Sequence, residues 1–161
     1  DKHEINRESD EDIAQMRKTL QDYRLSESVT MQQMSEGVKI RVKDKILFEK
    51  GSTVMANSSV VPVFQKIIKL MRDNDWTLFV EGYAAEGEVY AKEPNQGPFE
   101  LSALRAQEVT KALIKRGVRP EKITTVFYGD TRSTGEISDR KVEFILRKRD
   151  LKSKGREVPA Q

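Results

Sequence analysis

Residues 76–129 read WTLFVEGYAAEGEVYAKEPNQGPFELSALRAQEVTKALIKRGVRPEKITTVFYG and hold two short apolar runs, separated by an irregular segment and a stretch with helical periodicity. The runs at 76–80 and 123–128 are rich in aromatic and β-branched residues, which predicts strands. Helical periodicity extends from Ser102, the predicted N-cap, to Gly117, where a left-handed C-terminal residue is expected. This stretch therefore predicts a strand, a long loop, a helix and a second strand.

The segment between the first strand and the helix, residues 83–100, is unusual in its length. It contains two glycines and two prolines and shows no sustained hydrophobic period. Loops of more than about 12 to 15 residues are uncommon inside a compact domain, and they often carry function. We therefore expect this loop to take part in the functional site.

The flanking sequence adds further elements. Alternating apolar residues predict strands at 37–42 and 141–146, each with one buried face. A short apolar run at 46–48 follows the first of them, and Asn57 or Ser58 is the predicted cap of another helix. Strands separated by helices and then followed by an adjacent pair predict one sheet covered on one face. The predicted fold class is an α/β (α+β) two-layer sandwich.

Residues 1–36 are predicted to form a helix and a linker ahead of a core domain that spans 37–147. The helix is indicated by four apolar residues at spacings of three and four, Ile13, Met16, Leu20 and Tyr23. This stripe either packs on its own domain or forms a dimer seam. We favour the first interpretation, because the stripe is shorter than the heptad repeats of a coiled coil. Residues 26–36 are expected to be irregular, and 148–161 to form a basic, flexible tail.

Composition argues against several classes of protein. Lys+Arg 29 against Asp+Glu 26 leaves a net charge of +3, which gives no support to a nucleic-acid partner. Cysteine is absent and His3 is the only histidine, which excludes disulfides, thiolate zinc sites and multi-histidine metal sites. The usual general base is missing as well. Because the sequence starts at Asp1 rather than at Met, we expect a longer parent chain in which an anchor can lie upstream.

Four short motifs follow one another through the core: Phe48 with Gly51-Ser52, Val80-Glu81-Gly82, Leu101-Ser102-Ala103-Leu104-Arg105-Ala106, and Ser138-Asp139-Arg140-Lys141-Val142-Glu143. In order and spacing they resemble the OmpA-like peptidoglycan-binding domain. The third motif is the most specific, since it resembles the family's Leu-Ser-x-x-Arg-Ala helix start. The resemblance implies a β-α-β-α-β-β core with one mixed sheet, preceded here by an extra N-terminal helix.

Two further motifs, Phe99-Glu100-Leu101-Ser102-Ala103 and Gly129-Asp130-Thr131-Arg132, resemble the flagellar stator B subunits of the MotB type within that family. The resemblance implies a non-catalytic periplasmic domain that anchors a membrane protein to the cell wall and is itself tethered by a segment outside this chain. The implied partners are peptidoglycan, a second copy in a homodimer, and envelope or flagellar motor proteins. No cofactor and no metal are implied.

The resemblance also implies a binding site for the diaminopimelate of peptidoglycan stem peptides, which presents a carboxylate beside an ammonium group. Arg105 would hold the carboxylate through its planar guanidinium near a helix N-terminus. Taken alone, without the resemblance, Arg105 is more simply explained as part of a surface ion pair. The other implied site positions are Tyr83, Ala84, Ala85, Leu101, Ser102, Asp139 and Arg140.

The ligand loop departs from the family pattern. Gly82-Tyr83-Ala84-Ala85 stands where the family has Gly-His-Thr-Asp, so the carboxylate that would pair with the ligand ammonium is missing at Ala85. Glu86 and Glu88 are candidates to replace it. Asp139 stands in place of a family asparagine. Its carboxylate is a candidate partner for Arg105 or Arg140, and such a pair would close the pocket.

These departures keep a second interpretation open. The domain would then have lost diaminopimelate binding and would serve protein interaction or dimerisation. An enzyme that acts on the wall ranks last, because the sequence shows no pairing of a nucleophile with a base.

Overall fold

The computed structural model describes residues 2–35 and 37–148 of the chain. A six-stranded mixed sheet forms its centre, with the order β1-β2-β6-β4-β5 and with β3 paired to β6. Only β4 and β5 run parallel among the strand pairs of these residues. The strands are β1 (Val29–Met34), β2 (Gly37–Val42), β3 (Ile46–Leu47), β4 (Trp76–Gly82), β5 (Ile123–Phe127) and β6 (Lys141–Lys148).

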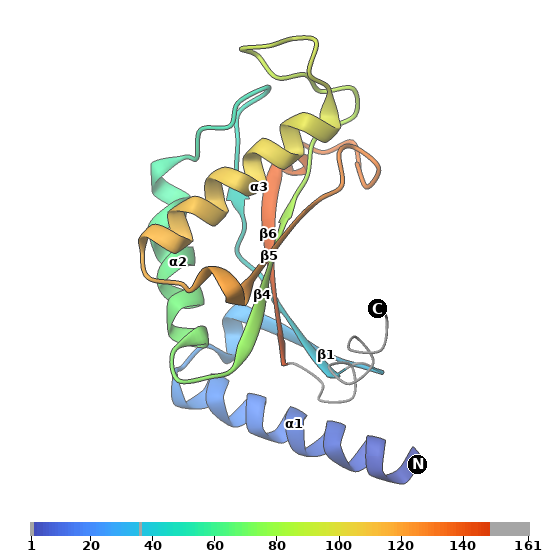
Figure 1. The fold of residues 1–161 in the computed structure, drawn as a ribbon, viewed down its shortest axis with the longest axis vertical. Coiled ribbons are helices and arrows are strands. Elements are labelled where there is room, and N and C mark those ends of the chain that lie inside the picture. Colours follow the sequence, from blue (N-terminus) through green and yellow to red (C-terminus); the bar gives the residue numbers. More distant parts are fainter. Residues whose placement is uncertain (1, 36, 149–161) are drawn as a thin grey trace.

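Helices α2 (Asn57–Met71) and α3 (Pro98–Lys115) lie on one side of this sheet, and α1 (Lys2–Asp22) runs across one end of it (Figure 1). Short 3-10 turns occur at Ser26–Ser28, Pro120–Lys122 and Ile137–Asp139. The predicted two-layer α/β sandwich with one mixed sheet is confirmed. So are the strands predicted at 37–42, 76–80, 123–128 and 141–146, to within two residues at each end.

The core forms between the helices and the apolar face of the sheet. Along β2, and along β4 as far as Val80, every second residue is buried, because successive side chains of a strand point to opposite faces. In the centre of the sheet Val80 of β4 pairs with Phe144 of β6, and both are fully buried. The helices contribute Val60, Val63, Phe64, Ile67 and Leu70 from α2 and Ala106, Val109 and Leu113 from α3.

The N-terminal helix packs on this same core. Met16 and Leu20 are buried within the core cluster, and Ile13 and Tyr23 pack against it while partly exposed. The apolar stripe therefore lies on its own domain, as the favoured interpretation holds. The prediction of an irregular linker over 26–36 is wrong, because Val29–Met34 pairs with β2 in antiparallel register as the edge strand β1.

Both helix starts differ from the predicted caps. α2 starts at Asn57 with Ala56 in the N-cap position, and α3 starts at Pro98, four residues before Ser102. Gly97 takes the N-cap position of α3, and its N–H donates to the Glu100 carboxylate at 2.9 Å. A proline in the first turn suits a helix, because the amide there needs no partner.

The predicted helix end at Gly117 is confirmed. Gly117 has a φ of +103°, and the N–H of Val118 reaches back to the carbonyl of Leu113 at 3.1 Å.

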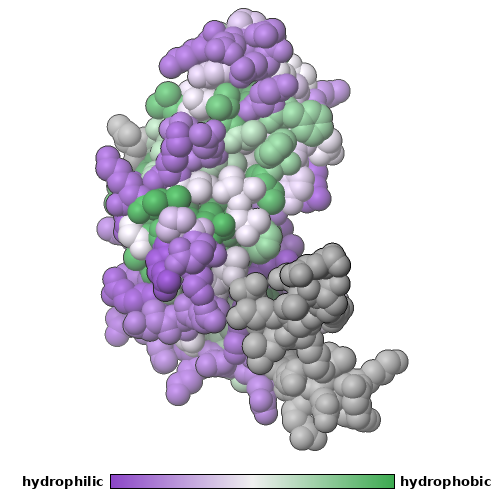
Figure 2. All heavy atoms as spheres, in the orientation of Figure 1, coloured by the Kyte–Doolittle hydropathy of each residue, from purple (hydrophilic) through white to green (hydrophobic). Residues whose placement is uncertain are grey.

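The surface carries apolar side chains in separate places. On the face drawn in Figure 2, hydrophilic residues cover most of the ends of the molecule, and apolar residues form small patches between them. Exposed large apolar residues include Val54, Val61, Val89, Phe99, Phe127 and Ile137. Apolar residues exposed singly are normal in folded proteins. No helix among the described residues is both long enough and apolar enough to cross a membrane.

Candidate functional site

The first turns of α3 lie directly on the end of β4. A Cβ built on Gly82 would come within 2.1 Å of the backbone oxygen of Ser102, so only a residue without a side chain fits there. Ser102 is fully buried, accepts the N–H of Gly129 at 2.9 Å and donates to the carbonyl of Phe99 at 2.9 Å. Leu101 is fully buried as well, so α3 is held in place at the point where Arg105 leaves it.

Arg105 uses all five of its N–H donors inside the chain. Nε donates to the carbonyl of Ser52 at 2.9 Å. Nη1 donates to the carbonyl of Tyr83 at 3.2 Å and to Glu88 Oε1 at 2.9 Å. Nη2 donates to the carbonyl of Glu49 at 3.2 Å and to Glu88 Oε2 at 2.5 Å. The side chain is 0% exposed, so the alternative of a surface ion pair is wrong.

Glu88 receives two further hydrogen bonds from the backbone. The N–H of Gly51 donates to Oε2 at 2.7 Å, and the N–H of Ala85 donates to Oε1 at 2.9 Å. Burial by itself raises the pKa of Glu88, but the hydrogen bonds from Arg105, Gly51 and Ala85 outweigh it and hold the pKa below the ordinary value. Four donors from three segments thus form a complete carboxylate-binding site, and the carboxylate in it belongs to the chain itself.

The aromatic ring of Phe48 lies against the Arg105 guanidinium. The Arg105 guanidinium lies 5.2 Å from the centre of the ring, within the range of a cation–π contact. Phe48 is itself held through its backbone, since its N–H donates to the carbonyl of Arg140 at 3.0 Å. Arg140 Nε approaches the Phe48 carbonyl at 3.4 Å in return. Arg140 therefore holds the segment that follows β3 and carries Phe48.

Of the other predicted site residues, Tyr83 and Ala84 are buried and Ala85 is half-buried, unlike Glu86. Tyr83 accepts from Arg105 through its carbonyl, and Ala85 donates to Glu88 through its N–H. Ala84 is buried, and its N–H donates to the carbonyl of Gly129 at 2.9 Å. The Tyr83 ring faces a different cluster, where its hydroxyl donates to the carboxylate of Glu81 at 3.2 Å. Glu86 is exposed.

Glu81 is a buried acid that accepts hydrogen bonds from two tyrosines. Tyr128 donates to it at 2.8 Å, and the Tyr83 and Tyr128 rings lie 5.1 Å apart. Burial, and then the negative charges of Glu81 and Glu143, raise the pKa of the Tyr83 phenol well above its ordinary value. Tyr83 therefore stays neutral and acts as a hydrogen-bond donor to Glu81.

Asp139 does not reach Arg105 in this structure. Its carboxylate accepts the Ser133 hydroxyl at 3.0 Å, the Thr134 N–H at 2.9 Å and hydroxyl at 2.6 Å, and the Gly135 N–H at 2.9 Å. Burial alone raises the pKa of Asp139, but these donors lower it to about 2. Asp139 thus fixes the 133–135 turn that leads into β6.

Replacing Asp139 with asparagine is expected to destabilise the domain by about 1 to 3 kcal/mol. The amide nitrogen of asparagine cannot accept the hydrogen bonds that one carboxylate oxygen of Asp139 accepts now. A group whose pKa is lowered on folding stabilises the fold above its unfolded pKa and stops doing so as the pH falls through the folded value. The wild type should therefore lose this contribution progressively as the pH falls from the ordinary Asp pKa of 3.8 to about 2. Urea unfolding at pH 7 and pH 2 measures both effects. A variant as stable as the wild type at pH 7 would contradict this role.

Several contributors to the site were not among the predicted residues. The Ser52 and Glu49 carbonyls and the Gly51 N–H act through the backbone, so their side-chain identities carry little information. Gly51 is the exception: its φ is +69°, and a Cβ there would lie 2.9 Å from the carbonyl oxygen of Val89. The Phe48 and Gly51-Ser52 motif was therefore the available signal for this side of the site.

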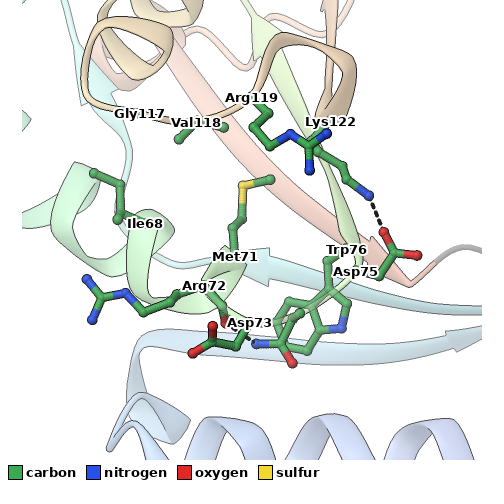
Figure 3. A pocket seen from close by; sticks show the side chains of 11 residues that line it. Ile68, Met71, Arg72, Asp73, Asp75, Trp76, Gly117, Val118, Arg119 and Lys122 are labelled. Carbon is green, nitrogen blue, oxygen red and sulfur yellow. Dashed lines mark hydrogen bonds and ion pairs between the residues drawn. The ribbon is translucent and has the colours of Figure 1, made fainter.

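A cavity of about 470 Å³ opens at the other end of β4, near the start of the strand (Figure 3). Ile68, Met71, Trp76 and Val118 line it with apolar atoms, and Lys122 forms an ion pair with Asp75 at its edge. None of the predicted site residues lines this cavity. In the part of the chain that the structure describes, no three acidic or histidine side chains gather so that they could hold a metal ion.

The class of domain follows from comparison of the sequence and the fold with known proteins. The OmpA family model matches residues 47–142, and the chain belongs to the OmpA family. A curated relative is motility protein B of Helicobacter pylori, which is 26% identical over 110 residues that make up 67% of this chain. The chain spans only 42% of that relative's length. The chain is accordingly an OmpA-like domain, and domains of this family are structural rather than catalytic.

Solved structures share the fold. A MotB-like protein from Desulfovibrio vulgaris superimposes with a TM-score of 0.65 at 20% identity, covering 90% of this chain and 94% of that one. The periplasmic domain of Helicobacter pylori MotB gives a TM-score of 0.59 at 20% identity, with 81% and 88% covered. The OmpA-like domain of FopA1 from Francisella tularensis gives 0.56 at 19% identity, with 73% and 77% covered.

Proposed function

We propose that this chain is a periplasmic domain that anchors a flagellar stator protein of the MotB type to the cell wall, with Arg105 as receptor for a carboxylate of the peptidoglycan stem peptide. One observation carries the proposal. Arg105 and the N–H groups of Gly51 and Ala85 converge on a single carboxylate, which Glu88 now supplies. Such a set of donors recognises carboxylates in general.

Diaminopimelate is the proposed source of that carboxylate. Its ammonium group would lie toward the 83–85 segment, where Ala85 offers no charge and Glu88 is committed to Arg105. We therefore expect weak binding, dominated by the carboxylate. The domain would be tethered to a membrane by a segment outside this chain, and its further partners would be a second copy of itself and proteins of the flagellar motor or the envelope.

Co-sedimentation with purified peptidoglycan sacculi tests the proposal. The wild-type domain should pellet with the sacculi, and Arg105→Lys should pellet less, because an ammonium cannot make the two parallel hydrogen bonds of a guanidinium. Ala85→Asp should pellet more, since it supplies an anion for the ligand ammonium. Circular dichroism confirms that each variant is folded. Wild type that stays in the supernatant while Ala85→Asp pellets would show that wall binding is not the present role of this domain.

The second candidate function follows from the same contacts. All N–H groups of Arg105 already have partners inside the chain, and Ala85 carries no charge for a ligand ammonium. In this second function the domain would bind no wall ligand and would serve protein interaction or dimerisation. Sedimentation equilibrium of the whole chain measures self-association, since α1 and β1 are part of the folded domain and cannot be removed without disturbing it. A strict monomer at high concentration would exclude dimerisation.

A further inference from the structure

We propose that Glu88 is a resident ligand of the Arg105 receptor and that an external carboxylate binds only by displacing it. The external ligand is the peptidoglycan carboxylate of the proposed function, on which this inference rests. The four donors that bind Glu88 are those that an external carboxylate at this receptor would use. Binding of the two carboxylates is therefore mutually exclusive.

No donor of Arg105 remains for a second carboxylate. Two of its five N–H groups go to Glu88, and the other three go to the carbonyls of Ser52, Tyr83 and Glu49. The side chains of Arg105 and Glu88 are 0% and 2% exposed, so a ligand cannot approach the guanidinium past Glu88. The loop that carries Glu88 must move first.

The loop is built so that Glu88 is its main anchor. From Ala85 to Gly97, a segment described in full, Glu88 is the only buried residue. Two backbone contacts assist it: Ala91 donates to the carbonyl of Gly51 at 2.9 Å, and Gly87 donates to Asp130 Oδ2 at 2.9 Å in an exposed position. Release of Glu88 thus moves a segment whose other side chains are already in contact with water.

The internal ligand lowers the apparent affinity for the external one. A carboxylate on the same loop is present at a high effective concentration, which a wall carboxylate has to overcome. If the open state is populated at about 10% or less, the apparent dissociation constant rises by about tenfold or more. Removing the Glu88 carboxylate should abolish this competition while leaving the Arg105 guanidinium and the Gly51 N–H in place.

The first experiment tests the receptor without the wall. Glu88→Ala leaves a vacant carboxylate site, so sodium acetate should raise its melting temperature above that in sodium chloride of equal ionic strength. The wild type should not respond, because Glu88 already fills the site. Glu93→Ala, which removes an exposed acid from the same loop, is the matched control and should behave as the wild type does. The absence of an acetate response in a folded Glu88→Ala domain would overturn the inference.

The second experiment adds sacculi. Half-saturation of Glu88→Ala should occur at a sacculus concentration lower by about tenfold or more than for the wild type, as the competition predicts. If both bind equally, the wall ligand does not compete with Glu88, and the inference fails while the proposed function stands. If Glu88→Ala responds to acetate but neither protein binds sacculi, the proposed function fails, and displacement by the wall fails with it. If Glu88→Ala does not fold, Glu88→Gln is the substitute: its neutral amide binds the guanidinium more weakly than a carboxylate does and is displaced more easily, so both changes should have the same direction and a smaller size.

Discussion

Replacing Arg105 with methionine is expected to destabilise the domain by about 3 to 5 kcal/mol, because it removes one partner of a buried ion pair and leaves the other uncompensated. The carbonyls of Ser52, Tyr83 and Glu49 lose their donor in the same substitution. Urea unfolding at pH 7 measures the loss. Arg41→Met is the matched control: Arg41 pairs with Glu143 at 2.5 Å but is 41% exposed, so the expected cost is about 0 to 1 kcal/mol.

The pH dependence of this loss has a definite sign. The folded pKa of Glu88 is lowered, so its ionised form stabilises the wild type at pH values above the ordinary glutamate pKa, and that contribution is lost as the pH falls through the lower folded value. The gap in stability between the wild type and Arg105→Met should therefore narrow in acid. A gap that stays constant from pH 7 to pH 3, or an Arg105→Met cost as small as that of Arg41→Met, would contradict a structural role for the pair.

Replacing Gly82 with alanine is expected to cost more than the roughly 1 to 3 kcal/mol of ordinary overpacking in a core. The added Cβ would lie 2.1 Å from the backbone oxygen of Ser102 and 3.0 Å from the Cβ of Ala106. Backbone atoms cannot move aside as a flexible side chain does, so α3 would have to lift from β4. Because Arg105 leaves α3 one turn further on, the contact with Glu88 should weaken as well.

Gly97→Ala is the matched control for this substitution. The nearest atom to a Cβ there is a Glu100 carboxylate oxygen at 3.7 Å, which is an ordinary contact. Urea unfolding of both variants, with near-ultraviolet circular dichroism of the folded states, compares them directly. Equal urea midpoints for Gly82→Ala and Gly97→Ala would contradict this prediction, because they would show that α3 can move away from β4 at little cost.

The sequence alone determined the central elements of this fold. Alternation in 37–42 and 141–146 specified which face of each strand is buried, because the side-chain period of a strand is a local property of the backbone. Gly117 marked the end of α3 for a similar reason, since few residues other than glycine adopt a positive φ without strain. The ordered motifs around Phe48, Leu101 and Asp139 then indicated the family that the match over 47–142 shows.

Other features depended on contacts between distant parts of the chain. Residues 29–34 carry two glutamines and no regular alternation, and they form a strand because β2 offers a free edge with which they pair. α3 begins at Pro98 rather than at Ser102, and the Ser102 hydroxyl accepts a hydrogen bond from Gly129 of a separate loop instead of capping the helix. A local cap preference is weak compared with such a buried hydrogen bond.

The state of the binding site was decided by tertiary structure alone. The sequence placed an arginine at 105 and removed an acid at 85, and it left Glu86, Glu88 and Asp139 as candidate carboxylates. Which one pairs with Arg105 depends on where the 85–97 loop lies, and Gly51 fixes that loop from a segment 37 residues before Glu88. Charge alone could not select among the three acids, because pairing of a buried ion depends on converging donors and on exclusion of water, which only the assembled fold provides.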